Sequence, residues 1–187
     1  MRTFIAVDPP EEVKARIHEF VRPFRQSYSR GIAWSSSRDL HVTLKFLGEI
    51  EESRIPLVKE AVRSAAAATA AFPVAVAGTG SFPPFSRHPR VLWIGLEESR
   101  ALEDLQACLE NGLKACGFPR DDRPFHPHLT AARIKSGGIP PPLIGRWAEA
   151  EGKPFGRMEV REIVVYRSLL HPGGAEHQPV FSETLRP

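Results

Sequence analysis

The chain has 187 residues, 42% hydrophobic and 25% charged, and these proportions are typical of a globular protein with a substantial core. The sequence predicts neither a membrane span nor a secretory signal, because no apolar run is long enough to cross a bilayer and the first residues lack a signal peptide's apolar core. We therefore expect a cytoplasmic protein with a single domain over 1–187. The net charge of +3 suits an anionic partner without requiring one.

The hydrophobic pattern predicts alternating strands and helices in the first part of the chain. An apolar run at 3–7 predicts a strand, and Asp8 is expected to cap a helix whose apolar residues recur at helical spacing up to Phe24. A second strand is predicted over 39–48, and a second helix that ends in the alanine run 65–68.

The later part of the chain adds paired strands to this alternation. Strands are predicted over 72–82 and 90–97, followed by an amphipathic helix over 102–113 that Gly117 ends. Three more strands are predicted over 126–134, 159–170 and 178–185. A loop or short helix is expected between the first and the second of them. The mixture of alternation and hairpins predicts an α+β fold.

The cysteines predict no disulfide and no structural metal site. Cys108 and Cys116 lie in one predicted helix at a spacing that corresponds to about 12 Å, which is too far for a disulfide. No Cys-x-x-Cys pair or Cys/His cluster of zinc-finger spacing is present. Both residues are interpreted as small apolar side chains.

Two predicted strands carry the same pattern, "HVTLKFLG" and "HPHLTAAR". Residues i and i+2 of a strand share a face, so His41 projects with Thr43 and His128 with Thr130. One such pair alone is ordinary strand sequence, in which histidine stands beside a β-branched residue. Two pairs in a chain of this size suggest that the strands lie together and that two imidazoles and two hydroxyls converge.

Such a convergence suits displacement at phosphorus. Histidine titrates near neutrality, so one imidazole can take a proton from an attacking water while the other gives a proton to the leaving oxygen. Threonine hydroxyls can donate hydrogen bonds to the non-bridging oxygens, where negative charge gathers. This chemistry needs neither a protein nucleophile nor a metal.

The stretches "HVTLKFLG" and "RPFHPHLTAAR" resemble the paired H-x-T-x signatures of the two-histidine (2H) phosphoesterases. Within that superfamily the chain resembles the bacterial and archaeal RNA 2′,3′-cyclic phosphodiesterases, also called 2′-5′ RNA ligases. The resemblance extends over nearly the whole chain, through "RTFIAVDPPEEV", "FPPFSRHPRVLWIGL" and "VVYRSLLHPGGAEH". It implies a two-lobed α+β fold with pseudo-symmetric antiparallel sheets that line a central cleft, and with the helices outside.

The resemblance also implies a role for each motif residue. His41 is expected to be the proton donor and His128 the proton acceptor, while Thr43 and Thr130 hold the phosphate. Arg133 matches a family arginine that contacts the phosphate or the nucleotide. No metal and no cofactor are expected.

Strand parity by itself supports neither Arg133 nor Phe46 as a site residue. Arg133 is an odd number of residues from Thr130, so a bulge or the strand end must turn it inward, and a solvated surface arginine is the alternative. Phe46 shares no face with His41 in a regular strand. Core packing is its first interpretation, and base stacking at a strand end is the alternative.

Several further residues keep two interpretations. His126 could complete a three-histidine metal site with His41 and His128, or stand beside the motif without binding anything. Trp34 could pack between lobes or cover a base. Three basic residues could widen a rim for RNA or form a solvated face: Arg30, Arg38 and Lys45.

The remaining histidines have no partner pattern, so surface or loop positions are expected for His18, His88, His171 and His177. Two positions depart from the family pattern, which usually has a larger apolar residue at Ala131 and often an aromatic residue near His177.

These observations predict a metal-independent enzyme that opens a terminal 2′,3′-cyclic phosphate of RNA to a 2′-phosphate, with possible 2′-5′ ligation in reverse. Its partners would be RNA ends that carry the cyclic phosphate, such as tRNA halves, and it would act as a monomer without a membrane. The alternative is a non-catalytic RNA-binding module in which the two motifs only bind.

Overall fold

The structure, a computed structural model, describes residues 1–84, 88–135, 138–171 and 174–187. It contains α-helices and short 3₁₀-helices at the following positions: α1 (Glu11–Ser27), η1 (Ser37–Asp39), η2 (Glu52–Arg54), α2 (Ile55–Ala68), α3 (Arg100–Ala115) and α4 (Pro141–Ala148). Its strands are β1 (Arg2–Val7), β2 (Ile32–Trp34), β3 (Val42–Glu49), β4 (Phe72–Phe82), β5 (Val91–Leu96), β6 (His128–Ile134), β7 (Pro154–Val160), β8 (Glu162–His171) and β9 (Gly174–Thr184). The predicted α+β fold is confirmed.

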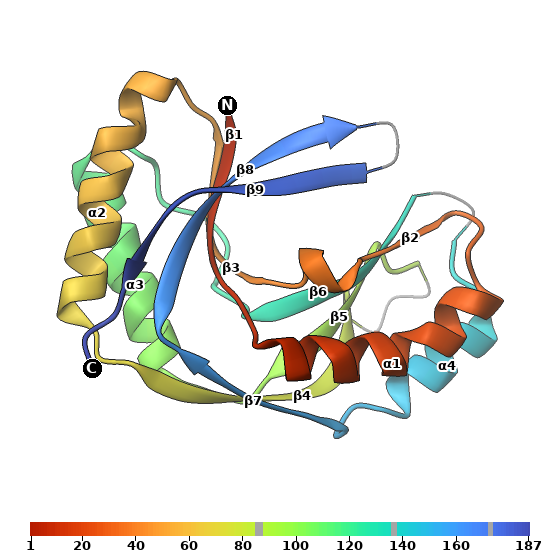
Figure 1. Cartoon of the computed structure of the whole chain (residues 1–187). Coiled ribbons are helices and arrows are strands. Elements are labelled where there is room, and N and C mark those ends of the chain that lie inside the picture. Colours follow the sequence, from red (N-terminus) through yellow and green to blue (C-terminus); the bar gives the residue numbers. More distant parts are fainter. Residues whose placement is uncertain (85–87, 136–137, 172–173) are drawn as a thin grey trace.

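All nine strands belong to one antiparallel sheet with the order β7-β4-β5-β6-β3-β1-β8-β9, and β2 pairs with β6 beside this path. The order is symmetric about the junction of β6 and β3, with three further strands on each side. One H-x-T motif lies at the start of each of these two central strands. The topology therefore brings together two segments that are far apart in the sequence (Figure 1).

The helices pack on the two halves of the sheet in pairs. α2 packs against α3, β8 and β9, while α3 also contacts β3. α1 packs against β7, and α4 packs against β4. Figure 1 shows α2 and α3 together beside one half of the sheet and α1 and α4 together beside the other.

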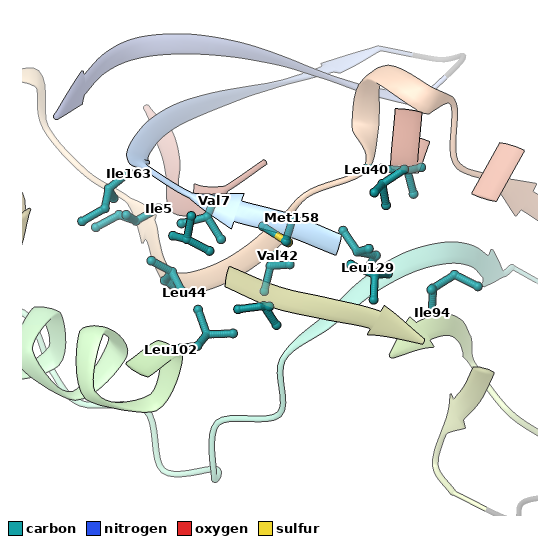
Figure 2. Packing of buried hydrophobic residues seen from close by; sticks show 14 of the residues in the cluster. Ile5, Val7, Leu40, Val42, Leu44, Ile94, Leu102, Leu129, Met158 and Ile163 are labelled. Atoms are coloured by element: carbon teal, nitrogen blue, oxygen red, sulfur yellow. The ribbon is translucent and has the colours of Figure 1, made fainter. Parts of the chain in front are cut away.

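The core lies between the helices and one face of the sheet. Val42 of β3 and Leu129 of β6 are fully buried in it, together with Leu102 of α3. Figure 2 shows these residues within the cluster. Because side chains alternate along a strand, burial of Val42 and Leu129 turns the histidines and threonines next to them to the opposite face.

Three local predictions differ from the structure. The single strand predicted over 159–170 is two strands, β7 and β8, which separate at Arg161. Asp8 does not cap α1, because the N-cap residue is Pro10 and no side chain bonds there. The Asp8 carboxylate instead accepts a hydrogen bond from the Tyr166 hydroxyl. The short strand β2 was not predicted, since three residues are too few to show a period.

The predicted end of the third helix is confirmed. Gly117 follows α3 with a φ of +81°, a left-handed conformation that favours glycine, and the Phe118 amide bonds back to the Leu113 carbonyl. Cys108 and Cys116 are both free. Across the described residues, no helix is long and apolar enough to cross a membrane.

Candidate active site

The two H-x-T motifs meet at the centre of the sheet. β3 and β6 are antiparallel and paired at Val42 and Leu129. Continuing this register by one residue in each direction puts the histidine of each motif beside the threonine of the other. The two histidines are then diagonal neighbours, with Cβ atoms about 7–8 Å apart or somewhat closer. That separation suits a tetrahedral phosphate held between two imidazoles.

His41 is held by aromatic and polar contacts just before β3. Its ring stacks on Phe4 of β1 with centroids 4.7 Å apart, and a hydrogen bond joins it to the backbone of Asp39. Burial, and next the nearby charge of His177, lower the pKa of His41 from 6.5 to about 4, while the Asp39 contacts oppose that shift. His41 is therefore neutral at pH 7 in the protein without substrate.

His128 has a matching environment on β6. Its Nδ1 lies 2.8 Å from the backbone oxygen of His126, and its ring meets Phe82 edge-on with centroids 5.0 Å apart. Burial first, and then the charges of His126 and Arg133, lower the pKa of His128, against the opposing effect of the backbone hydrogen bond. Both motif histidines thus bond to the backbone of the residue two positions earlier. In His128 the bond is made by Nδ1, which leaves Nε2 for proton transfer.

A bulge in β3 brings Phe46 to the face that carries His41. Along β1, Ile5 pairs with Lys45 but Ala6 pairs with Thr43, so Leu44 is the extra residue of the bulge. Phe46 consequently pairs with Phe4 and lies 6.1 Å from its ring, centroid to centroid. With 57% of its surface exposed, Phe46 is not a core residue, and the core-packing interpretation is wrong.

A second bulge has the same effect on Arg133. Trp93 of β5 pairs with Thr130, but Leu92 pairs with Ala132, so Ala131 is the extra residue and both alanines are buried. The side chain of Arg133 is exposed on the face of Thr130. Its charge lowers the pKa of both His41 and His128, as expected for a cation close to the two rings. The bulge that was needed to turn Arg133 to the face of Thr130 is therefore present in β6.

The bulge in β3 buries a lysine. Lys45 is 3% exposed, and its Nζ lies 2.9 Å from Glu110 of α3 and 3.3 Å from Asp121. It also donates to the Pro119 carbonyl at 2.9 Å. Lys45 is therefore a buried ion-paired residue, and its interpretation as part of a basic rim is wrong. Arg30 and Arg38 are exposed.

The described residues include no group of three or more His, Cys, Asp or Glu side chains placed to hold a metal ion. His126 and His128 have ring centroids 6.4 Å apart, and His126 packs against Trp93 at 5.3 Å. Removal of metal ions by a chelator tests the three-histidine alternative directly.

A family model described as the 2′-5′ RNA ligase superfamily matches residues 9–172. The chain belongs to the 2′-5′ RNA ligase superfamily. A superfamily member of Methanothermobacter thermautotrophicus, named RNA 2′,3′-cyclic phosphodiesterase, is 30% identical over 98% of this chain and 96% of its own length. A protein of the same name from Archaeoglobus fulgidus is 33% identical over 93% of this chain and 94% of its own.

The superfamily fold is also found among solved structures. The crystal structure of TT0787 of Thermus thermophilus superposes on this chain with a TM-score of 0.82 and 32% sequence identity. The match covers 100% of this chain and 98% of that chain. The resemblance predicted from "HVTLKFLG" and "RPFHPHLTAAR" is therefore confirmed at the level of family and fold.

Sequence reasoning missed one residue of this superfamily member's site. His177 was expected on the surface or in a loop, but it lies half-buried in β9 with its ring 5.3 Å from that of His41. Only the family's preference for an aromatic residue nearby hinted at this. Trp34 packs against Phe24 of α1 and Trp147 of α4, so packing is favoured over covering a base.

Proposed function

We propose that this superfamily member opens a terminal 2′,3′-cyclic phosphate of RNA to a 2′-phosphate by acid–base catalysis between His41 and His128. The enzyme is a phosphodiesterase, as the shared name of its curated relatives supports. The observation that carries the mechanism is the antiparallel register of β3 and β6, which sets the two H-x-T motifs beside each other on one face.

The two histidines divide the proton transfers. Nε2 of neutral His128 takes a proton from water as the water oxygen attacks phosphorus. The bond from phosphorus to O3′ breaks, and His41 donates its proton to that oxygen. One proton enters His128 and one leaves His41, so the site returns to its starting state when a proton passes back through solvent. The hydrogen bond at 2.8 Å between Nδ1 of His128 and the His126 carbonyl favours the required tautomer.

The substrate itself supplies the charge that His41 needs. With a pKa of about 4, His41 carries little proton in the free protein at pH 7. A phosphate anion beside its ring raises that pKa, because an opposite charge favours the imidazolium. The proton donor is therefore completed by binding of the cyclic phosphate.

Three side chains bind the phosphate in this proposal. Thr43 and Thr130 donate their hydroxyls to non-bridging oxygens, where charge develops as the bond to O3′ breaks. Arg133 contributes a fixed positive charge, and its effect on both histidines supports a position near both rings. Its guanidinium can donate two parallel hydrogen bonds to one phosphate.

Phe46 provides an exposed ring next to the phosphate site. We assign it to stacking on the base of the terminal nucleotide, since an aromatic ring stacks on any base. The ring of Phe4, its neighbour on β1, lies 6.1 Å away from centroid to centroid and supports its position. Physiological substrates would be RNA ends with a cyclic phosphate, including tRNA halves, and the protein would act as a cytoplasmic monomer.

The same site can also join RNA ends when a ribose 5′-hydroxyl takes the place of water as the nucleophile. The 5′-oxygen attacks phosphorus, the bond from phosphorus to O3′ breaks, and a 2′-5′ bond forms. His128 takes the proton of the 5′-hydroxyl and His41 donates a proton to O3′, and the two histidines exchange these roles only when a 2′-5′ bond is cleaved back to the cyclic phosphate. Water at its ordinary concentration favours hydrolysis.

A turnover assay on a nucleoside 2′,3′-cyclic phosphate, with and without EDTA, tests the proposal. We expect release of the 2′-phosphate at the same rate in both. Loss of turnover with EDTA and its recovery with Zn²⁺ would replace acid–base catalysis by metal chemistry at His41, His126 and His128. Binding of RNA ends without any turnover would favour the non-catalytic binding module.

A further inference from the structure

A third histidine packs against the first motif. His177 lies in β9, paired with Ser168 of β8. Its ring meets that of His41 edge-on, with centroids 5.3 Å apart and planes at 87°. The same ring meets Phe4 edge-on at 4.9 Å, and Phe4 stacks on His41. The three rings form one packed unit.

The environment of His177 disfavours its charged form. Nδ1 of His177 is buried and has no hydrogen-bond partner in the described part of the chain. An imidazolium carries two N–H donors, whereas the neutral ring can leave Nδ1 as an unprotonated nitrogen. A buried donor without an acceptor costs more free energy than an unpaired lone pair on the same atom.

The charged groups around His177 act in both directions. Arg133 of β6 and Arg2 of β1 repel a proton on its ring, and Asp39 attracts one. Burial is the largest influence, so the pKa of His177 is lowered overall. His177 in turn lowers the pKa of His41, because two cationic rings at this separation repel each other.

We propose that His177 is a positioning residue for His41: its ring holds the His41 ring against Phe4, and any charge on it opposes a charge on His41. The proposal rests on the function given above, since it matters for catalysis only if His41 transfers a proton. His177 acts through His41 in this scheme.

Two substitutions separate the packing from the charge. His177→Phe keeps a flat ring but cannot take a proton, so the pKa of His41 should rise above about 4, while burial still holds it below 6.5 and kcat stays close to the wild-type value. His177→Ala removes both effects. The His41 ring should then move out of line, and kcat should fall by roughly 10- to 100-fold in addition to the rise in pKa.

The readouts are NMR titration of the His41 ring in the full-length protein and the pH profile of kcat/KM. The matched control is His171→Phe. It changes an exposed histidine on β8 whose Nε2 lies 3.2 Å from the Glu176 carboxylate, and it should move neither readout. Proper folding of each variant is checked by its thermal midpoint.

An unchanged pKa of His41 in His177→Phe would overturn the role of the charge, and a wild-type kcat in His177→Ala would overturn the role of the ring. The titration needs no substrate. A wild-type protein without turnover on a cyclic phosphate would therefore refute the proposed function, while the effect of His177 on His41 could still be measured.

Discussion

The two motif strands share a bulge at the same distance from the histidine but carry different side chains after it. In both β3 and β6 the extra residue of the bulge is the third after the histidine, Leu44 in one and Ala131 in the other. In both, the fifth residue after the histidine therefore returns to the site face. That residue is Phe46 in β3 and Arg133 in β6. In the proposed function, one half of the site thus offers a ring for a base, and the other offers a cation for a phosphate.

The two bulges also differ on the side that faces the core. The second inward residue of the β6 bulge is Ala132, which is fully buried and apolar, whereas the corresponding residue of β3 is Lys45. Burial of an amine is tolerated there because Glu110 and the Pro119 carbonyl surround Nζ. The two motif strands are therefore supported differently on the side of the core, and this difference can be tested.

The largest effect is expected where the two halves are equivalent. His41→Ala and His128→Ala should each lower kcat by ~10²–10⁴, since each removes one proton transfer of the same displacement. The double variant should lose little more than either single one. Because both side chains are partly exposed, unfolding free energies should change by about 1 kcal/mol or less.

His126→Ala is the matched control for the pair, since it lies two residues before His128 and outside the motif. It should keep most of the activity measured on a nucleoside 2′,3′-cyclic phosphate. An equal loss of turnover in His126→Ala and His128→Ala, or near-normal turnover in either motif variant, would show that the catalytic roles belong to other residues.

The next effect concerns the support of β3. Lys45→Met leaves Glu110 buried without its partner, so the free energy of unfolding in urea should fall by about 3–5 kcal/mol. The double variant Lys45→Met with Glu110→Leu should recover most of that loss. Lys114→Met, which changes an exposed lysine of α3, is the control and should have little effect. Stability unchanged in Lys45→Met would mean that the ion pair does not support the bulge.

A smaller effect distinguishes Phe46 from Arg133. Phe46→Ala should raise KM for a nucleoside cyclic phosphate by roughly 10-fold, independently of salt, because it removes base stacking. Arg133→Ala should lower kcat/KM by about 10- to 100-fold and weaken its dependence on salt, because it removes a charge from the phosphate site. Steady-state kinetics at two salt concentrations measure both. Identical salt dependence in the two variants would contradict this division of roles.

The smallest effect is a displacement along the pH axis. The profile of kcat/KM should be bell-shaped and centred below pH 6.5, because the pKa values of both His41 and His128 are lowered in the free protein. The descending limb of kcat should lie at higher pH than that of kcat/KM, since a bound phosphate raises the pKa of His41. A rate that rises steadily to high pH would indicate attack by hydroxide.

Much of the fold and the family of the chain could be predicted from the sequence, because both rest on local patterns. Apolar periodicity located the helices α1, α2 and α3, and the family resemblance of the two motifs identified the superfamily. Alternation along a strand was enough to place each histidine with its threonine. A predicted strand boundary was wrong where the apolar pattern does not change, as at Arg161 between β7 and β8.

Only the tertiary structure decided what the bulges and the far strands contribute. A bulge is defined by pairing with a partner strand, so residue parity within β3 predicted a buried Phe46 and an exposed Lys45, the reverse of what is found. Likewise, His177 has no local pattern that relates it to His41. It reaches the site because β9 pairs with β8, β8 with β1, and β1 with β3. The sequence by itself determined the two motif pairs, while non-local pairing determined what surrounds them.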